Sequence, residues 1–407
     1  MSTRTAHTAF VVLGCGTLIV LLSFGLRTNF GLYMGPISTD LGWGREIFAF
    51  AIALQSLVWG ISTPLFGFLS DRYGPAKVVA VGGALYAGGL FVMSQATQPA
   101  DATIGIGVMT GFASAMTGFP IILSVIGRRF PPETRSFYLG IASAGGSSGQ
   151  LILVPLGQLF ITTSGWSVAM VYIALMAGMI VPLAASLAGG NARAIDDHST
   201  LSFKEAMYEA RAHRGFRLLV CGYFVCGAQT MFIGAHLPAY LSDLGHPVWV
   251  GTTALALIGG FNIVGSVIWG KLGTVYPKKN LLCVLYALRS VAMMIFILTP
   301  ITPLSTILFT STMGLLWLGT VPLTTGIVAQ VFGTQFMATL VGLTFVSHQI
   351  GSFLGIWLGG LVYDLYGTYD PVFWGAIIVG FAASLVHYPI DERPLARLKM
   401  PMPQAAQ

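Results

Sequence analysis

Apolar stretches long enough to cross a lipid bilayer follow one another along almost the whole chain. The hydrocarbon core of a bilayer is about 30 Å thick and a helix rises about 1.5 Å per residue, so a span needs about 20 apolar residues. Twelve segments meet that requirement, at approximately residues 9–36, 46–69, 77–96, 102–127, 136–162, 167–188, 216–241, 249–270, 280–299, 304–331, 335–362 and 371–389. Backbone polar groups in lipid must be satisfied within the protein, so these segments predict an all-α integral membrane protein with twelve transmembrane helices.

Charged side chains are too scarce for a soluble domain. They make up 8% of the 407 residues, whereas soluble domains carry about 25%. The net charge of +6 would favour a nucleic-acid partner in a soluble protein, but here the cations follow the membrane topology. If the N-terminus is cytoplasmic, all of the 20 Lys and Arg residues fall in cytoplasmic segments except Arg27, Arg45 and Arg289. This positive-inside asymmetry predicts a multi-pass protein of the inner (plasma) membrane, with both termini cytoplasmic, the lipid bilayer as its environment and no nucleic-acid partner.

The chain divides into two halves of six spans each. We expect an N-terminal six-helix bundle over residues 1–190, a cytoplasmic central loop over 191–214, and a C-terminal six-helix bundle with a short cytoplasmic tail over 215–407. A shift of 202 residues aligns matching residues of the two halves, namely Pro120 with Pro322, Phe130 with Phe332, Gly140 with Gly342, Gly149 with Gly351 and Gly157 with Gly359. Two copies of six spans point the same way through the membrane. The two bundles are therefore expected to be pseudo-symmetric about an axis along the membrane normal, with a substrate site between them.

A short charged turn between the second and third spans reads Gly67-Phe-Leu-Ser-Asp71-Arg72-Tyr-Gly74-Pro-Ala-Lys77. Gly67 is suited to a close helix contact, Asp71 to pairing near a helix end, and Gly74 to a turn that other residues resist. The turn resembles the G-x-L-x-D-R-x-G-x-K loop of the major facilitator superfamily, and a second copy at residues 270–279 lacks the Asp-Arg pair. The resemblance implies the major facilitator fold and a gating role for Gly67, Asp71, Arg72 and Gly74.

Arg27 is the leading candidate for binding a ligand. A charge inside the bilayer is costly and therefore marks a functional candidate, and the superfamily resemblance implies that the first helix lines a central cavity. An arginine there can grip a carboxylate with two parallel hydrogen bonds. The alternative is that Arg27 extends to the outer membrane interface, which its distance of roughly ten residues, about 15 Å, from the span's end makes difficult.

His348 and Arg289 are the other two deep ionisable residues. His348 shares a helical face with Gly351, Gly355 and Gly359, so it is either a packing histidine on a closely packed face or a cavity cation that exchanges protons. Arg289 lies in the ninth span, which is peripheral in the superfamily. For Arg289 a structural role, bonding carbonyls or reaching toward the Lys278-Lys279 loop, stands beside substrate binding.

The uncharged candidates for the substrate site are Tyr33, Asn262, Trp317, Thr320 and Thr324. The last three are spaced i, i+3 and i+7 in the tenth span, another expected cavity helix. Each polar residue in this set has a competing interpretation as an interhelical hydrogen-bonding group.

Acidic residues are missing from the middle of every predicted span. A cationic substrate would find no buried counter-charge, so the cavity is expected to be electropositive and to favour an anion. The sequence holds no phosphate-binding Gly-Lys-Ser/Thr loop, catalytic set or metal-ligand spacing. We therefore expect no enzyme activity, no cofactor and no metal site.

Two further segments resemble a particular branch of the superfamily. Residues 27–36 with 41–45, and the run from Ser347 to Gly360, look like the bacterial branch of the monocarboxylate transporter and oxalate/formate antiporter families. Those families carry small carboxylates with buried cations, and Arg27 and His348 fall at or near two of the cation positions. The sequence departs from the pattern in the eighth span, where Asn262 and Ser266 stand about where a charged pair is usual.

The sequence as a whole predicts a secondary active transporter of a small organic anion, with a monocarboxylate favoured, that works by alternating access. A proton or a counter-anion is the candidate coupling partner. The alternative functions are an exporter of neutral or amphiphilic compounds and a membrane receptor that keeps a transporter fold without transporting.

Overall fold

The computed structural model describes residues 3–130, 132–188, 203–333 and 337–396, and over these residues the chain forms helices and no β-strand. The helices up to residue 188 are α1 (Thr3–Thr28), α2 (Phe30–Leu41), α3 (Arg45–Tyr73), α4 (Pro75–Ser94), α5 (Pro99–Ala102), the π-helix η1 (Thr103–Met109), α6 (Thr110–Thr117), α7 (Phe119–Arg129), α8 (Pro132–Gly178), α9 (Ile180–Ala184) and the 3-10 helix η2 (Ala185–Leu187). The helices after residue 202 are α10 (Phe203–Ala212), α11 (Arg214–Asp243), α12 (Val248–Val275), α13 (Lys278–Leu298), α14 (Pro303–Leu316), α15 (Thr320–Phe332), α16 (Met337–Tyr366) and α17 (Asp370–His387).

Twelve membrane crossings arise from eleven long apolar segments of the described chain, because one segment folds back on itself. That segment, Tyr138–Leu187, has 50 residues, enough for about 75 Å of straight helix, more than twice the thickness of a bilayer core. Its chain reverses at Gly165, where φ is 76°. The rings of Phe160 and Tyr172, which a straight helix would separate by about 18 Å, lie 5.1 Å apart. The predicted fifth and sixth spans are therefore separate crossings.

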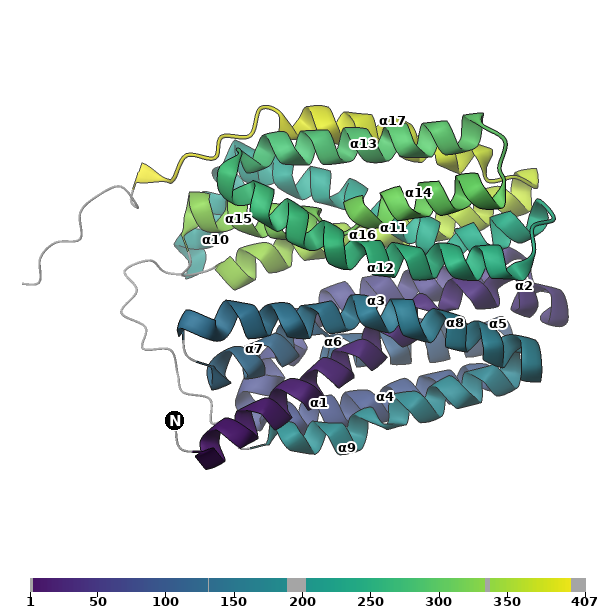
Figure 1. Ribbon diagram of the computed structural model, residues 1–407, viewed down its shortest axis with the longest axis horizontal. Helices are drawn as coiled ribbons and strands as arrows, with labels where there is room; N and C mark the ends of the chain where they lie inside the picture. The colour runs from purple at the N-terminus through teal and green to yellow at the C-terminus, as the bar shows by residue number, and fades with distance from the viewer. Residues whose placement is uncertain (1–2, 131, 189–202, 334–336, 397–407) are drawn as a thin grey trace, which may run out of the picture.

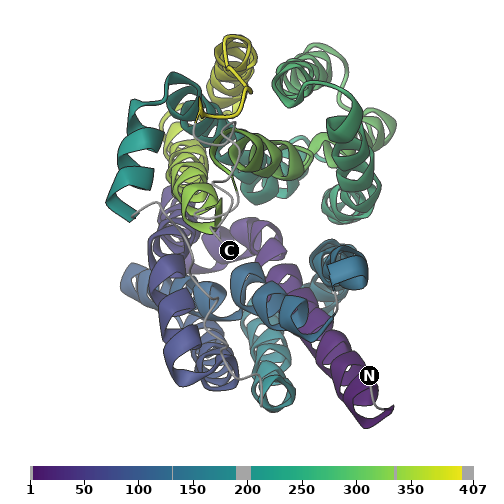
Figure 2. The same cartoon turned by 90° about the vertical axis from the view of Figure 1, so that its left-hand side faces the viewer.

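The crossings form two side-by-side bundles (Figures 1 and 2). Helices up to α9 make one bundle and α11 to α17 make the other. The start of α1 and the segment after α17 lie at the same end of the molecule (Figure 1). The bundles meet along α3 and α16, along α8 and α12, and along α2 and α11.

The internal repeat of the sequence corresponds to equivalent packing in the two bundles. A Cβ atom added to Gly149 of α8 would lie 2.2 Å from the carbonyl oxygen of Leu21 in α1. A Cβ on the matching Gly351 of α16 would lie 1.9 Å from the carbonyl oxygen of Phe224 in α11. In each half the glycine therefore allows the first crossing and the fifth crossing of that half to touch backbone to backbone. The glycine face of α16 packs within its own bundle.

Several crossings are interrupted rather than continuous helices. α1 and α2 meet at Asn29, α6 and α7 meet at the extended Gly118, and α14 and α15 are separated by residues 317–319. The expected central loop is partly helical, since α10 occupies residues 203–212, and its residues 191–202 lie outside the described part of the chain. The interruptions in the first and tenth crossings border the pocket described below.

The charged turn between α3 and α4 is shorter than the sequence suggested. α3 continues through Arg72 to Tyr73, and the turn is Gly74 alone, whose φ of 94° favours glycine. The expected close helix contact at Gly67 is wrong for this conformation, since no atom lies within 4 Å of a Cβ built there. Arg72 is exposed, with its guanidinium carbon 5.6 Å from the ring centroid of Tyr73. The Asp71 side chain is not among the described side chains.

We predict that Gly355→Ala lowers the stability of the protein, because a Cβ there would lie 2.3 Å from the carbonyl oxygen of Ala228 in α11. The neighbouring atoms are backbone, so the helices must separate, at a cost of about 1–3 kcal/mol. Gly375→Ala in α17 is the matched control, since a Cβ there meets nothing within 4 Å. Thermal unfolding in detergent measures both variants, and equal melting temperatures would contradict the packing argument.

Candidate functional site

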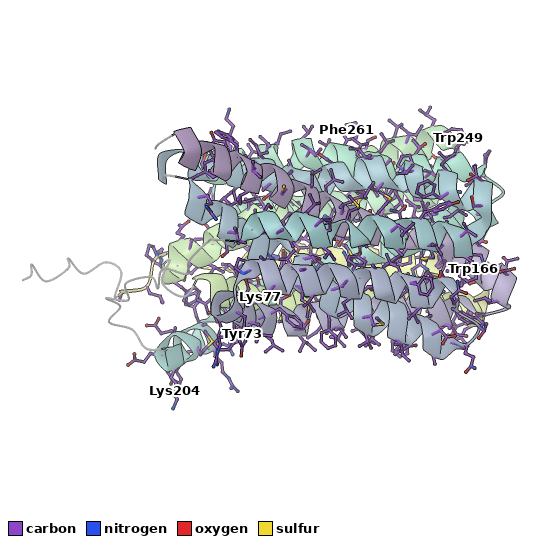
Figure 3. All side chains as sticks on the ribbon, turned by 90° about the horizontal axis from the view of Figure 1, so that it is seen from below. Tyr73, Lys77, Trp166, Lys204, Trp249 and Phe261 are labelled. Atoms are coloured by element: carbon purple, nitrogen blue, oxygen red, sulfur yellow. The ribbon has the colours of Figure 1, made fainter. Side chains whose placement is uncertain are left out.

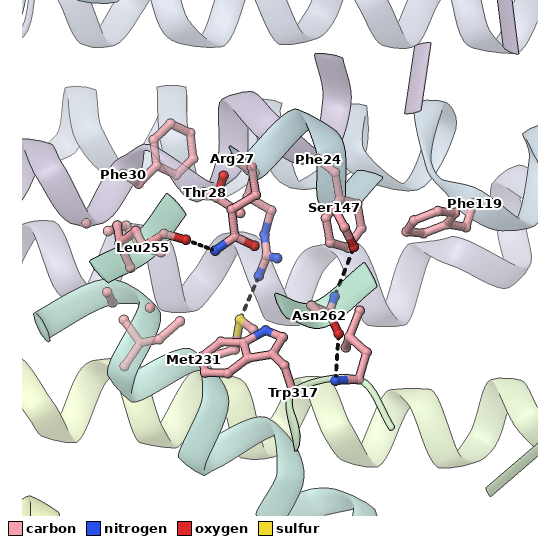
Figure 4. Close-up of a pocket in the computed structure, with 17 residues that line it drawn as sticks. Phe24, Arg27, Thr28, Phe30, Phe119, Ser147, Met231, Leu255, Asn262 and Trp317 are labelled. Atoms are coloured by element: carbon pink, nitrogen blue, oxygen red, sulfur yellow. Dashed lines mark hydrogen bonds between the residues drawn. The ribbon is translucent and has the colours of Figure 1, made fainter. Parts of the chain in front are cut away.

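A pocket lies between the two bundles in the interior of the molecule (Figure 4). It contains about 700 Å³ of empty space, including some open solvent. Nine of its seventeen lining residues come from the first bundle and eight from the second. Of the sequence candidates, Arg27, Asn262 and Trp317 line it. A site with walls from both bundles changes shape whenever the bundles move relative to each other.

Arg27 is the charged residue in the lining of this pocket. Its side chain is only 8% exposed, so it does not extend to a membrane interface. Nε donates to Oε1 of Gln55 at 3.3 Å, and Nη2 donates to Oγ of Ser56 at 3.1 Å and to Sδ of Met231 at 3.3 Å. The guanidinium carbon lies 4.8 Å from the ring centroid of Trp59. Met231 belongs to the second bundle, so the Arg27 side chain spans the pocket, as Figure 4 shows.

The positive charge of Arg27 has no counter-charge among the described side chains. Its acceptors are an amide, a hydroxyl and a thioether, and Nη1 donates no hydrogen bond to any described group. A buried charge without a partner of opposite sign is unfavourable. A bound anion would supply both the missing charge and acceptors for the Nη1 protons.

Arg289 stabilises the interruption of the tenth crossing and does not line the pocket. It is fully buried, and its Nε and Nη2 donate to the carbonyl oxygen of Leu316 at 3.0 and 2.6 Å. Nη2 also donates to the carbonyl oxygen of Trp317. These carbonyls end α14, where the helix dipole favours a cation. In this conformation Arg289 therefore bonds backbone carbonyls, which is the structural role that the sequence offered as one of its two interpretations.

Asn262 holds the other side of the same interruption. Its Oδ1 accepts a hydrogen bond from the backbone N–H of Leu318 at 3.1 Å, and its Nδ2 donates to Oγ of Ser147 at 2.9 Å across the bundles (Figure 4). Arg289 and Asn262 together bond three backbone groups at the interruption, which are the carbonyls of Leu316 and Trp317 and the N–H of Leu318. As a result Trp317 and Leu318 border the pocket.

Besides Arg289, four of the sequence candidates lie outside the pocket lining. Thr320 contacts Sγ of Cys226 through Oγ1 at 3.3 Å. Thr324 and Tyr33 are buried, and neither hydroxyl has a described hydrogen-bond partner. His348 is also buried, with its ring centroid 4.9 Å from that of Tyr223. The geometry therefore places these four side chains behind the walls of the site rather than in it.

His348 is nevertheless connected to Arg27 by hydrogen bonds. Oε1 of Gln349 is 3.0 Å from Nδ1 of His348, and Nε2 of Gln349 donates to the carbonyl oxygen of Ser56 at 3.0 Å. Oγ of Ser56 is one of the acceptors of Arg27. Because Gln349 lies in the second bundle and Ser56 in the first, this path crosses the interface between the bundles.

A second polar cluster joins the bundles at the end away from the termini. Arg45 of α3 donates two hydrogen bonds to the Asp243 carboxylate of α11, at 2.6 and 2.5 Å. The carboxylate of Asp364 accepts the backbone N–H groups of Arg45 and Glu46 at 2.9 and 2.8 Å, and so caps α3 from the other bundle. Glu46 accepts a hydrogen bond from Nε1 of Trp357 at 2.9 Å. We call these five residues the inter-bundle clamp.

A chain of hydrogen bonds connects the clamp to the pocket. Nη1 of Arg45 donates to the hydroxyl of Tyr369 at 2.9 Å, and that hydroxyl is 3.2 Å from Nδ1 of His236. Nε2 of His236 lies 2.7 Å from the carbonyl oxygen of Ile356, a pocket residue. A carbonyl can only accept, so Nε2 carries a proton and Nδ1 accepts from Tyr369.

A model of a known protein family matches most of the chain. The family model for the Major Facilitator Superfamily matches residues 16–356. The chain belongs to the Major Facilitator Superfamily.

Several transporters resemble the chain over nearly its full length. An uncharacterized MFS-type transporter, YcxA of Bacillus subtilis (strain 168), is 24% identical over 91% of this chain and 92% of that protein. Monocarboxylate transporter 13 of Rattus norvegicus is 25% identical over 92% and 89%. The oxalate:formate antiporter of Oxalobacter formigenes is 21% identical over 94% and 92%.

The fold has a solved counterpart. The crystal structure of a bacterial homolog to the human lysosomal transporter Spinster superposes with a TM-score of 0.69. The sequences are 15% identical, and the match covers 95% of this chain and 94% of the other. The sequence-based assignment to the superfamily, and its likeness to the monocarboxylate transporters, are confirmed.

In this superfamily member the sequence reasoning missed residues that carry no charge or lie near a helix end. Ser56 and Met231 are unremarkable by type, and their role follows only from facing Arg27. Ser147 lines the pocket but lies in the glycine-rich run 145–149, a composition that indicates close helix contact rather than a ligand site. The four charged clamp residues lie near the ends of predicted spans, where charges are common, and His236 could have been found only as a polar residue within the seventh predicted span.

We predict that Arg289→Met destabilises the protein by about 1–3 kcal/mol for each carbonyl left without a donor. The buried oxygens of Leu316 and Trp317 would lose their partner. Arg289→Lys should restore stability only in part, because an ammonium group cannot reproduce the planar fork. Thermal unfolding in detergent measures the series, and an unchanged melting temperature for Arg289→Met would exclude the capping role.

Proposed function

We propose that this protein is a secondary transporter of a small organic anion, with monocarboxylates favoured, and that Arg27 binds the carboxylate. The observation that carries the proposal is the Arg27 guanidinium, buried in a pocket between the bundles without a described counter-charge and with Nη1 unused. An arginine with free N–H groups suits a carboxylate better than any neutral group. The names of two relatives, a monocarboxylate transporter and an oxalate:formate antiporter, support the same class.

Alternating access would proceed by rocking the two bundles about the pocket. The positive-inside pattern supports cytoplasmic termini, which places the clamp at the external end. Figure 3 is consistent with this orientation, since Lys77 and Lys204 lie toward one end and Trp166 and Trp249 toward the other. The hydrogen bonds between the bundles in the described chain extend from the clamp to the depth of Arg27. We therefore assign the conformation to a state that is closed on the outside.

The remaining candidates take supporting roles in this proposal. His348 would act on the site through Gln349 and Ser56, and either a proton at His348 or an exchanged anion would couple transport. Gly74, Arg72 and Asp71 would contribute to closing the cytoplasmic side in the alternate state. Trp317 and Asn262 would contact the substrate, while Tyr33, Thr320, Thr324 and Arg289 would shape the helices behind it.

One observation favours the alternative of an exporter for neutral or amphiphilic compounds. The pocket walls are largely apolar, with Phe24, Phe119 and Leu255 among them. The two functions differ in what Arg27 does, because an uncharged substrate does not need a cation.

We predict that Arg27→Ala abolishes uptake of carboxylates into proteoliposomes while the protein remains folded. Loss of the buried ion pair with the substrate would weaken the binding free energy by about 2 kcal/mol or more, which is roughly a thirtyfold loss of affinity. Arg393→Ala is the matched control, since Arg393 is exposed and pairs with Asp391 in the tail. Undiminished carboxylate uptake by the Arg27 variant would rule out its role and favour the exporter.

A second prediction concerns the clamp. Asp243→Asn removes the ion pair with Arg45. We expect this to lower the free energy of the state open to the outside by about 1 kcal/mol relative to the closed state, which increases the population of the open state about fivefold. A cysteine introduced by Thr28→Cys, in the pocket lining, should then react faster with a membrane-impermeant thiol reagent added outside.

The control for the clamp is Asp391→Asn, which removes an exposed carboxylate outside the membrane. Hydrogen bonds from Arg393 lower the pKa of Asp391 to about 2, so this control also removes a full negative charge. Equal labelling rates in the two variants and the Thr28→Cys parent would contradict the assignment of the clamp as the external closure.

A further inference from the structure

An aromatic wall adjoins the guanidinium of Arg27. The Arg27 guanidinium lies over Trp59, the Trp59 ring is 5.8 Å from that of Phe24, and the Phe24 ring is 4.8 Å from that of Phe119. Phe24 and Phe119 line the pocket and are only partly buried. Leu318 faces the same pocket from the other bundle and is also partly exposed. One side of the cation thus continues into an uncharged, partly aromatic surface.

Three polar side chains of the lining, those of Thr28, Gln150 and Asn262, are already engaged in structural hydrogen bonds. The hydroxyl of Thr28 donates to a carbonyl of its own helix, and Nε2 of Gln150 donates to the carbonyl oxygen of Leu255. The amide of Asn262 is shared between Ser147 and Leu318. Arg27 is the one charged group of the lining, and its Nη1 protons have no described hydrogen-bond partner.

Met231 occupies the position that a carboxylate oxygen would take. Its sulfur is a weak acceptor for Nη2 of Arg27 at 3.3 Å. A carboxylate in place of this sulfur would receive hydrogen bonds from Nη2 and from the unused Nη1, the paired arrangement that arginine favours. The rest of such a ligand would extend into the part of the pocket walled by Phe24 and Phe119.

From this arrangement we propose that the substrates are monocarboxylates whose single carboxylate is joined to an aromatic or comparably large apolar body. The inference rests on the proposed role of Arg27 and narrows it. Phe24, Phe119 and Leu318 become specificity-determining residues, since they would contact the apolar body. The single cation disfavours dicarboxylates, whose second charge would be buried without a partner. Very short carboxylates would leave the aromatic surface uncovered.

The test compares binding of four probes to the purified protein by titration calorimetry, and their uptake into proteoliposomes. The probes are phenylacetate, acetate, oxalate and the neutral 2-phenylethanol. We expect phenylacetate to bind about tenfold or more tightly than acetate, because burial of a phenyl ring is worth at least that factor. Oxalate and 2-phenylethanol should bind more weakly than phenylacetate.

Two variants separate the roles of the wall and the cation. Phe119→Leu should reduce the preference for phenylacetate over acetate several-fold. Phe91→Leu is the matched control, because Phe91 is exposed on the outer face of α4, away from the pocket. Arg27→Met should abolish binding of both carboxylates.

The outcomes distinguish failure of this inference from failure of the proposed function. Arg27-dependent binding of acetate or oxalate, equal to or tighter than that of phenylacetate, would overturn the inference and leave anion transport standing. An unchanged phenylacetate preference in Phe119→Leu would likewise exclude that wall as the specificity determinant. Binding of 2-phenylethanol as tight as that of phenylacetate, unaffected by Arg27→Met, or no carboxylate binding at all, would overturn both.

Discussion

The isolated positive charge of Arg27 is the constraint on which the interior of this protein depends. In a low-dielectric interior a guanidinium must be hydrogen-bonded on most of its edges. Gln55 and Ser56, both in α3, accept hydrogen bonds from the guanidinium of Arg27, and the side chain of Gln55 is itself held by a hydrogen bond to Thr110 of α6. The first bundle thus positions the cation rigidly, and among the described residues the second bundle contributes only the weak acceptor Met231. A ligand can therefore displace the partner from one bundle without disturbing the support from the other.

Glycine provides the second requirement of the architecture, which is rigidity within each bundle. Backbone contacts at Gly149 and Gly351 tie the first and fifth crossings of each half together. Contacts between the bundles include side-chain hydrogen bonds, such as those of Gln349 and Asn262. Dense packing inside each half and hydrogen-bonded contacts between the halves are the conditions under which two bundles move as units.

The fold could be predicted from the sequence because lipid leaves few alternatives for long apolar segments. The position of Arg27 could be predicted for the same reason, since a mid-span cation has to face a polar interior. Arg289 and His348 are also ionisable residues in the middle of predicted spans, yet both lie outside the pocket lining. Whether a buried polar group faces a ligand or a broken helix depends on interruptions such as residues 317–319, which have no distinct composition. Met231 and Ser56 could not be found, because they matter only through what lies across from them.

The hydrogen-bond chain through Tyr369 and His236 has a mechanical consequence. It runs in one direction, from the guanidinium of Arg45 to the peptide oxygen of Ile356, and every member except the last donates to the next. Such a chain has a nearly fixed length. A molecule that pushed the backbone at Ile356 aside would therefore strain the contact of Arg45 with Tyr369. Binding in the pocket would in this way alter hydrogen bonds at the distant end of the molecule.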